Sequence, residues 1–179
     1  NFLQSFRNNN YTIIFADYSP DGSKILLTTS KDSLEIIDVA IGKKTVSPIV
    51  HPGLIMAKYN MDGKRIITAS SDSTAKIWNA STGTLLHTLV GHDAGLLFAA
   101  FSPDNTRIVT TSVDRTAIIW DNNGLALDTL IGHTEKVIFA AFSPDSKNLI
   151  TASEDKTAKI WDINSGKLKL TLKGHTDWV

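Results

Sequence analysis

Short apolar runs separated by polar turn residues follow one another along the chain. In its last quarter these runs cover Val137–Phe142, Leu149–Ser153, Thr157–Asp162 and Leu168–Leu172. None of them reaches the length of a helix, and all are rich in residues that favour strands, such as Val, Ile, Thr, Phe and Trp. The pattern therefore predicts four short strands in succession.

Turn-forming residues lie between the runs. Pro103-Asp104 and Pro144-Asp145 place proline at the second position of a turn, where its fixed φ is already suitable. Asn122-Asn123-Gly124 and Ser165-Gly166 mark further turns, because Asn and Gly tolerate positive φ. The chain thus predicts an all-β fold built from strands and tight turns.

The strand pattern repeats about every 41 residues, which places the chain among repeat proteins. FAAFSPD occurs at Phe98–Asp104 and again at Phe139–Asp145, with weaker copies at Ala16–Gly22 and Ala57–Gly63. A second repeated block runs in phase with the first. Its aspartates are Asp32, Asp72, Asp114 and Asp155.

The run Val137–Phe142 is apolar at both sets of alternating positions, which predicts a strand covered on both faces. In a β-sandwich, where each sheet has one solvent-exposed face, the strands would alternate apolar and polar residues. Four-stranded units of this period, each covered by its neighbours, are typical of a β-propeller. Shorter periods would indicate a β-helix, and a 3.6-residue pattern would indicate helical repeats.

Phased dipeptides resemble the signature of the WD-repeat (WD-40) family. Gly-His pairs occur at Gly91-His92, Gly132-His133 and Gly174-His175. The first two are followed, about 28 residues later, by Trp120-Asp121 and Trp161-Asp162. The resemblance extends over essentially the whole chain and implies a β-propeller of WD-repeat type.

The repeat predicts a single, partial propeller domain over residues 1–179. Four complete four-stranded blades are expected at about 11–50, 53–90, 94–131 and 136–173. Residues 2–6 align with a strand of a preceding blade, and 177–179 with the start of a following one. The missing blades could come from flanking sequence or a second copy, or the four blades could close on themselves.

His, Thr and Asp recur at fixed spacing and include the ingredients of a catalytic triad. An active site needs one such set, whereas a scaffold needs one in every blade. In the family, residues at these positions form a buried hydrogen-bonded chain from Trp through Thr and His to Asp. The complete sets are His92, Thr110, Asp114 and Trp120, and then His133, Thr151, Asp155 and Trp161.

The first two repeats depart from this pattern. In the first, Ile37 replaces the tryptophan, so this repeat should lack the network. In the second, Thr68, Asp72 and Trp78 are present, but His51 lies one position late, which makes a complete network there doubtful.

No catalytic, cofactor or metal site is predicted. The chain has no cysteine, and no two histidines have the spacing of metal ligands. His87 is expected on a surface or edge strand, and the acids Glu35, Asp93 and Glu135 are scattered singly. The rival hypothesis is a propeller enzyme or a small-molecule binder with a site in the channel.

The resemblance implies a non-catalytic scaffold that binds proteins or peptides, for example as one module of a signalling or assembly protein. Binding residues are expected in loops that differ between blades. The candidates are Lys31, Val113, Glu154, Lys136 and Trp178.

The charge balance and the hydropathy of the chain limit the classes of partner that it is expected to bind. The chain has 18 basic and 18 acidic residues, a balance that argues against nucleic acid as a partner. Its longest apolar run, about eight residues at Ala94–Phe101, is far below the roughly 20 that span a bilayer. We therefore expect no membrane insertion and, by default, a cytoplasmic location.

Overall fold

The computed structural model describes residues 11–177 and 179, which form an all-β structure without a helix. The described strands form four antiparallel sheets of four strands each. The first sheet contains β1 (Ile13–Tyr18), β2 (Lys24–Thr29), β3 (Ser33–Asp38) and β4 (Ile49–Val50). The second contains β5 (Leu54–Tyr59), β6 (Arg65–Ser70), β7 (Thr74–Asn79) and β8 (Leu85–Val90).

The last two sheets repeat this meander, in which consecutive strands pair with each other. The third sheet contains β9 (Leu96–Phe101), β10 (Arg107–Ser112), β11 (Ala117–Asp121) and β12 (Ala126–Leu130). The fourth contains β13 (Val137–Phe142), β14 (Asn148–Ser153), β15 (Ala158–Asp162) and β16 (Leu168–Leu172). Within the described residues no helix could cross a membrane.

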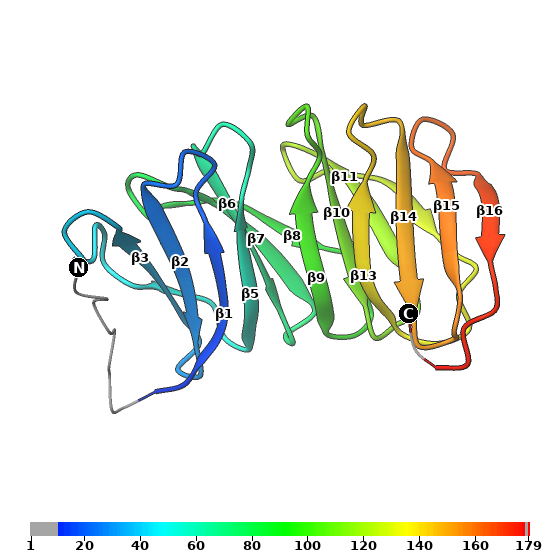
Figure 1. The fold of residues 1–179 in the computed structure, drawn as a ribbon, viewed down its shortest axis with the longest axis horizontal. Coiled ribbons are helices and arrows are strands. Elements are labelled where there is room, and N and C mark those ends of the chain that lie inside the picture. Colours follow the sequence, from blue (N-terminus) through cyan, green and yellow to red (C-terminus); the bar gives the residue numbers. More distant parts are fainter. Residues whose placement is uncertain (1–10, 178) are drawn as a thin grey trace.

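The sheets stand side by side in a row (Figure 1). The first strands of neighbouring sheets contact one another, from β1 to β5, β9 and β13. The first and last sheets lie at opposite ends of the row, so the four sheets form an open arc. This is the radial stacking expected of propeller blades.

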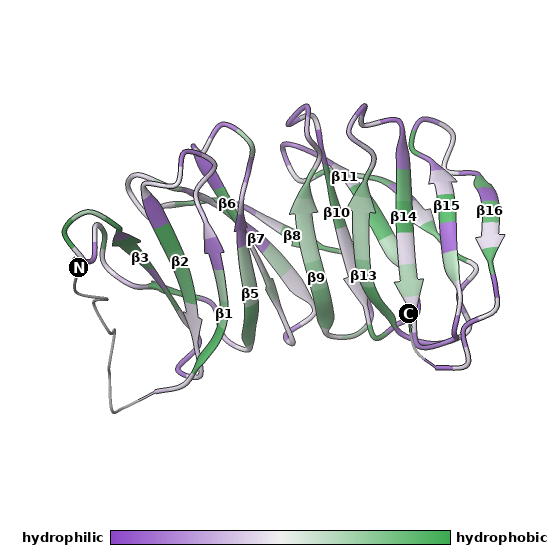
Figure 2. Cartoon of the chain, viewed as in Figure 1, coloured by the Kyte–Doolittle hydropathy of each residue, from purple (hydrophilic) through white to green (hydrophobic). Residues whose placement is uncertain are grey.

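Hydrophobic residues are concentrated in the strands, and the turns are mainly polar (Figure 2). Leu26 and Ile36 of the first sheet belong to one buried cluster with Leu54, Ile66 and Trp78 of the second. A larger cluster joins the second, third and fourth sheets. Burial on both faces explains why the strands read as nearly continuous apolar runs.

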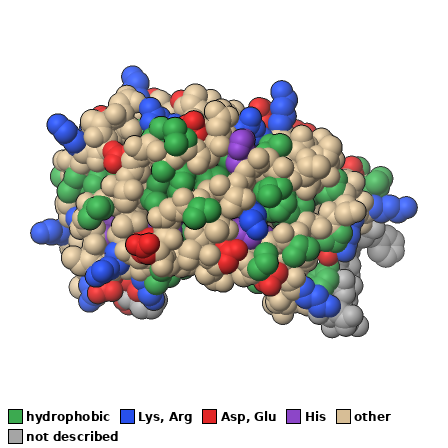
Figure 3. Space-filling model, turned by 180° about the vertical axis from the view of Figure 1, so that it is seen from behind, with side chains coloured by type: hydrophobic (Ala, Val, Ile, Leu, Met, Phe, Trp, Pro, Cys, Tyr) green, Lys and Arg blue, Asp and Glu red, His purple; other side chains and the backbone are tan. Residues whose placement is uncertain are grey.

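The outer surfaces are less uniform. On the side opposite to that of Figure 1, hydrophobic side chains occur in separate groups between polar ones (Figure 3). At the end of the row, Phe139 and Leu170 of the fourth sheet are 46% and 50% exposed. Phe98, which aligns with Phe139 in the repeat, is buried. The fourth sheet therefore presents a partly apolar outer face.

Two sequence predictions lie wholly or partly outside the described residues. Residues 2–6, predicted as a strand of a preceding blade, are not among them, and neither is Trp178. Of residues 177–179, the two that are described belong to no strand.

Candidate functional site

A chain of hydrogen bonds crosses the third sheet and involves the four residues predicted for it. Trp120 Nε1 donates to Thr110 Oγ1 over 2.8 Å. The same oxygen lies 2.8 Å from His92 Nε2, and His92 Nδ1 lies 2.7 Å from Asp114 Oδ2. Strand β11 supplies the tryptophan, β10 the threonine, and the two adjoining loops the histidine and aspartate. The chain thus ties two strands to the loops at one end of the sheet.

The donors and acceptors in this chain fix its proton positions. The Asp114 carboxylate can only accept, so His92 carries its proton on Nδ1; in that tautomer Nε2 accepts from the Thr110 hydroxyl, whose oxygen accepts from the Trp120 indole N–H. His92 Nε2 is then unprotonated, and Nδ1–H donates to Asp114. Burial alone would raise the pKa of Asp114, but hydrogen bonds from Thr116 and His92 lower it below its usual value.

The fourth sheet repeats the arrangement. Trp161 Nε1 donates to Thr151 Oγ1 over 2.9 Å, and His133 lies 2.8 Å from that oxygen and 2.7 Å from Asp155. Burial lowers the pKa of His133, which keeps the ring neutral at neutral pH. Burial opposes ionisation of Asp155, but hydrogen bonds from Thr157 and His133 outweigh it and lower its pKa to about 2.

The second sheet also has a continuous chain of hydrogen bonds. The doubt that the sequence raised about a complete network in this blade is therefore wrong. Trp78 donates to Thr68 over 2.9 Å, and Thr68 Oγ1 lies 2.8 Å from Nδ1 of His51. The imidazole is turned relative to His92, because His51 enters from one residue later in the loop. Its Nε2 lies 2.9 Å from Thr74 Oγ1 and 3.4 Å from Asp72, so the ring proton is on Nε2.

The first sheet has no such chain among its described residues, in agreement with the Ile37 substitution. Its third strand instead carries Glu35, a buried carboxylate. Glu35 accepts hydrogen bonds from Tyr11 over 2.9 Å and pairs with Lys44 over 2.6 Å. The sequence pattern presents Glu35 as an isolated acid, because neither partner lies in the repeated framework.

The same four-residue pattern in successive four-stranded sheets has a counterpart among known protein families. The model of the WD40 family, described as WD domain, G-beta repeat, matches residues 54–79, 83–121 and 124–162. The matches include more than half of the 179 residues. The chain belongs to the WD40 repeat family. Its four sheets are WD40 blades, and the family is usually non-catalytic.

The triad-like residues of these WD40 blades are unsuited to nucleophilic catalysis. The Thr110 and Thr151 hydroxyls are buried, and each already receives a tryptophan N–H. A nucleophile needs access to a substrate carbon, which these enclosed oxygens lack. Across the described chain, no group of three or more potential ligands could hold a metal ion.

The predicted binding residues that the structure describes lie on the WD40 face that carries the β2–β3, β6–β7, β10–β11 and β14–β15 turns. Here this surface is called the lower face, from its place in Figure 1. Lys136 Nζ lies 3.3 Å from the Glu154 carboxylate, so the structure brings these two candidates together. Lys31 and Val113 occupy the corresponding turns of two other blades, and Val113 is 37% exposed. His87 lies on β8, the edge strand of its sheet.

Proposed function

We propose that this WD40 domain is a non-catalytic scaffold that binds protein or peptide partners on its lower face. The observation that carries the proposal is the Lys136–Glu154 ion pair, which places opposite charges side by side on one blade. Corresponding turns carry a lysine in the first blade and a valine in the third. The four-stranded sheet beneath these positions recurs in every blade, so the face can vary without loss of the fold.

A mixed-charge face favours partners with complementary charges and contributes more to orientation and association rate than to raw affinity. The net charge of zero supports proteins or peptides over nucleic acid as partners. Trp178, the remaining candidate, lies outside the described residues and is proposed from its sequence position alone.

We predict that the double substitution Lys136→Glu with Glu154→Lys removes partner binding but leaves the fold intact. The exchange keeps an ion pair at the site and reverses its polarity, so the melting temperature should stay within about 2 °C. Proteins captured from a cell extract by the wild type should be at least tenfold depleted with the double variant. This can be measured by quantitative mass spectrometry.

Lys147→Glu is the matched control, because this exposed lysine lies in a turn at the opposite edge of the fourth sheet. It should retain the partners of the wild type. Capture of the same proteins by the double variant would exclude the Lys136–Glu154 pair from the binding face.

A further inference from the structure

The blades are also linked at the edge opposite to the lower face, where the β1–β2, β5–β6, β9–β10 and β13–β14 turns lie. Between the second and third blades, Met61 N donates to Asn105 Oδ1 over 3.0 Å. Between the third and fourth, Asp104 N donates to Ser146 Oγ over 3.2 Å. Gly63 holds the same turn position in the second blade and has no side chain that could reach the first.

A second link follows the same pattern. Arg65 donates to the Asn122 carbonyl over 2.8 Å, and Arg107 donates to Asn164 Oδ1 over 3.1 Å, each in the next blade. In the first blade the corresponding residue is Lys24. Among the described residues, the Lys24 ammonium has no hydrogen-bond or ion-pair partner. The interface between the first and second blades therefore lacks both links.

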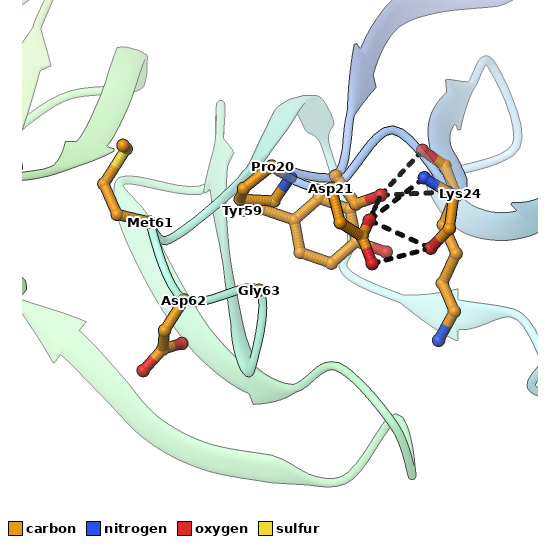
Figure 4. Close-up of a pocket in the computed structure, with 9 residues that line it drawn as sticks. Pro20, Asp21, Lys24, Tyr59, Met61, Asp62 and Gly63 are labelled. Carbon is orange, nitrogen blue, oxygen red and sulfur yellow. Dashed lines mark hydrogen bonds between the residues drawn. The ribbon is translucent and has the colours of Figure 1, made fainter.

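Their absence leaves a cavity of about 340 Å³ between the two turns, here called the Gly63 pocket (Figure 4). Asp21, Tyr59 and Lys24 lie on one side of it, and Met61 and Asp62 on the other. The corresponding cavity at the next interface is about 180 Å³, and Asn105 and Arg65 line it. The larger cavity thus occurs where glycine and lysine replace asparagine and arginine.

The walls of the Gly63 pocket favour a cation with an apolar stem. Asp21 and Asp62 outnumber the single ammonium of Lys24, and Pro20 and Met61 provide apolar contact. Hydrogen bonds from Ser19 and Ser23 lower the pKa of Asp21 to about 2, so this carboxylate is charged at neutral pH.

Two further features distinguish the wall of the Gly63 pocket. Among the described residues, Asp21 Oδ2 accepts a hydrogen bond only from Ser23, which leaves acceptor capacity for a ligand. The Tyr59 hydroxyl is buried and has no hydrogen-bond partner in the described chain. The corresponding residues of the next blades, Phe101 and Phe142, carry no hydroxyl at all.

We propose that the Gly63 pocket binds an arginine side chain of a peptide partner, with its guanidinium on Asp21 and its stem against Pro20 and Met61. The chain itself uses arginine at the two homologous positions, Arg65 and Arg107, to bridge neighbouring blades. A planar guanidinium also suits a carboxylate better than an ammonium does. The pocket lies at the edge opposite to the lower face, so this proposal is independent of the proposed scaffold surface.

The test is an NMR titration of the full ¹⁵N-labelled chain with N-acetyl-arginine methylamide. We expect saturable shifts of the Asp21 and Gly63 amides, and binding at least tenfold weaker for the uncharged citrulline analogue. Asp21→Asn should weaken binding of the arginine probe about tenfold or more, because the substitution removes the negative charge and keeps an acceptor oxygen.

Gly63→Asn should abolish binding of the arginine probe, because the asparagine side chain would fill the Gly63 pocket. Asn105 fills the corresponding space between the second and third blades in this way. Asparagine suits this turn, because Asn105 adopts φ 59° where Gly63 has 70°. A Cβ at Gly63 would meet only Pro20 Cδ, at 3.7 Å. An unchanged melting temperature would show that this variant folds.

Asp145→Asn, in the equivalent turn of the fourth blade, is the control and should bind the probe as the wild type does. Equal binding of the arginine and citrulline probes would overturn the proposal, as would undiminished binding by folded Gly63→Asn. The absence of saturable shifts would also overturn it. If inorganic phosphate shifts these amides and the arginine probe does not, the pocket recognises anions through Lys24 instead.

Discussion

Thr110→Val is expected to destabilise the protein by about 2–4 kcal/mol, because it leaves two buried partners without a hydrogen bond. Thr110 Oγ1 accepts from Trp120 and bonds to His92, and all three side chains are buried. Valine has nearly the same shape and suits a strand equally well. The loss therefore reports the hydrogen bonds rather than packing, and urea unfolding followed by circular dichroism measures it.

The adjacent residue supplies a matched control. Thr111 is fully buried on the same strand, but its Oγ1 has no hydrogen-bond partner in the described chain. Thr111→Val removes a polar atom that gains nothing from burial, so its effect should be neutral or stabilising. Similar losses of stability in the two variants would show that the hydrogen bonds through Thr110 contribute little to the stability of the protein.

Lowering the pH from 7 to 4 is expected to remove about 3 kcal/mol of stability through His51 alone. Burial lowers the pKa of His51 from its ordinary 6.5 to about 4, so the unfolded chain takes up the proton first. The contribution is complete above pH 6.5 and is lost as the pH falls toward 4. His133, whose pKa is also lowered by burial, acts in the same direction.

Asp155 extends the loss to lower pH. Its pKa falls from 3.8 to about 2 in the folded protein, so a further loss of about 2 kcal/mol develops between these values. Urea unfolding at intervals from pH 7 to 2 measures both steps. His51→Gln should be less stable at pH 7 but should have a shallower slope between pH 6.5 and 4. A wild-type slope in this variant would assign the titration to other groups.

The strands and their order could be predicted from the sequence, because apolar runs and turn residues are local signals. The networks around His92 and His133 were equally accessible, since their spacing is regular. The network around His51 could not be predicted, because spacing in the sequence does not reveal that the imidazole ring can turn and use its other nitrogen. The Gly63 pocket also had no local signal: it arises from side chains missing on two neighbouring blades.

The first blade differs from the others in two respects that act together. It lacks the tryptophan-to-aspartate chain, and its fourth strand, β4, pairs through only two residues. In a stacked array each unit depends chiefly on its own cohesion and on its neighbour. Amide protons of β1–β4 should therefore exchange with solvent sooner than those of the third blade, so that unfolding starts in the first blade.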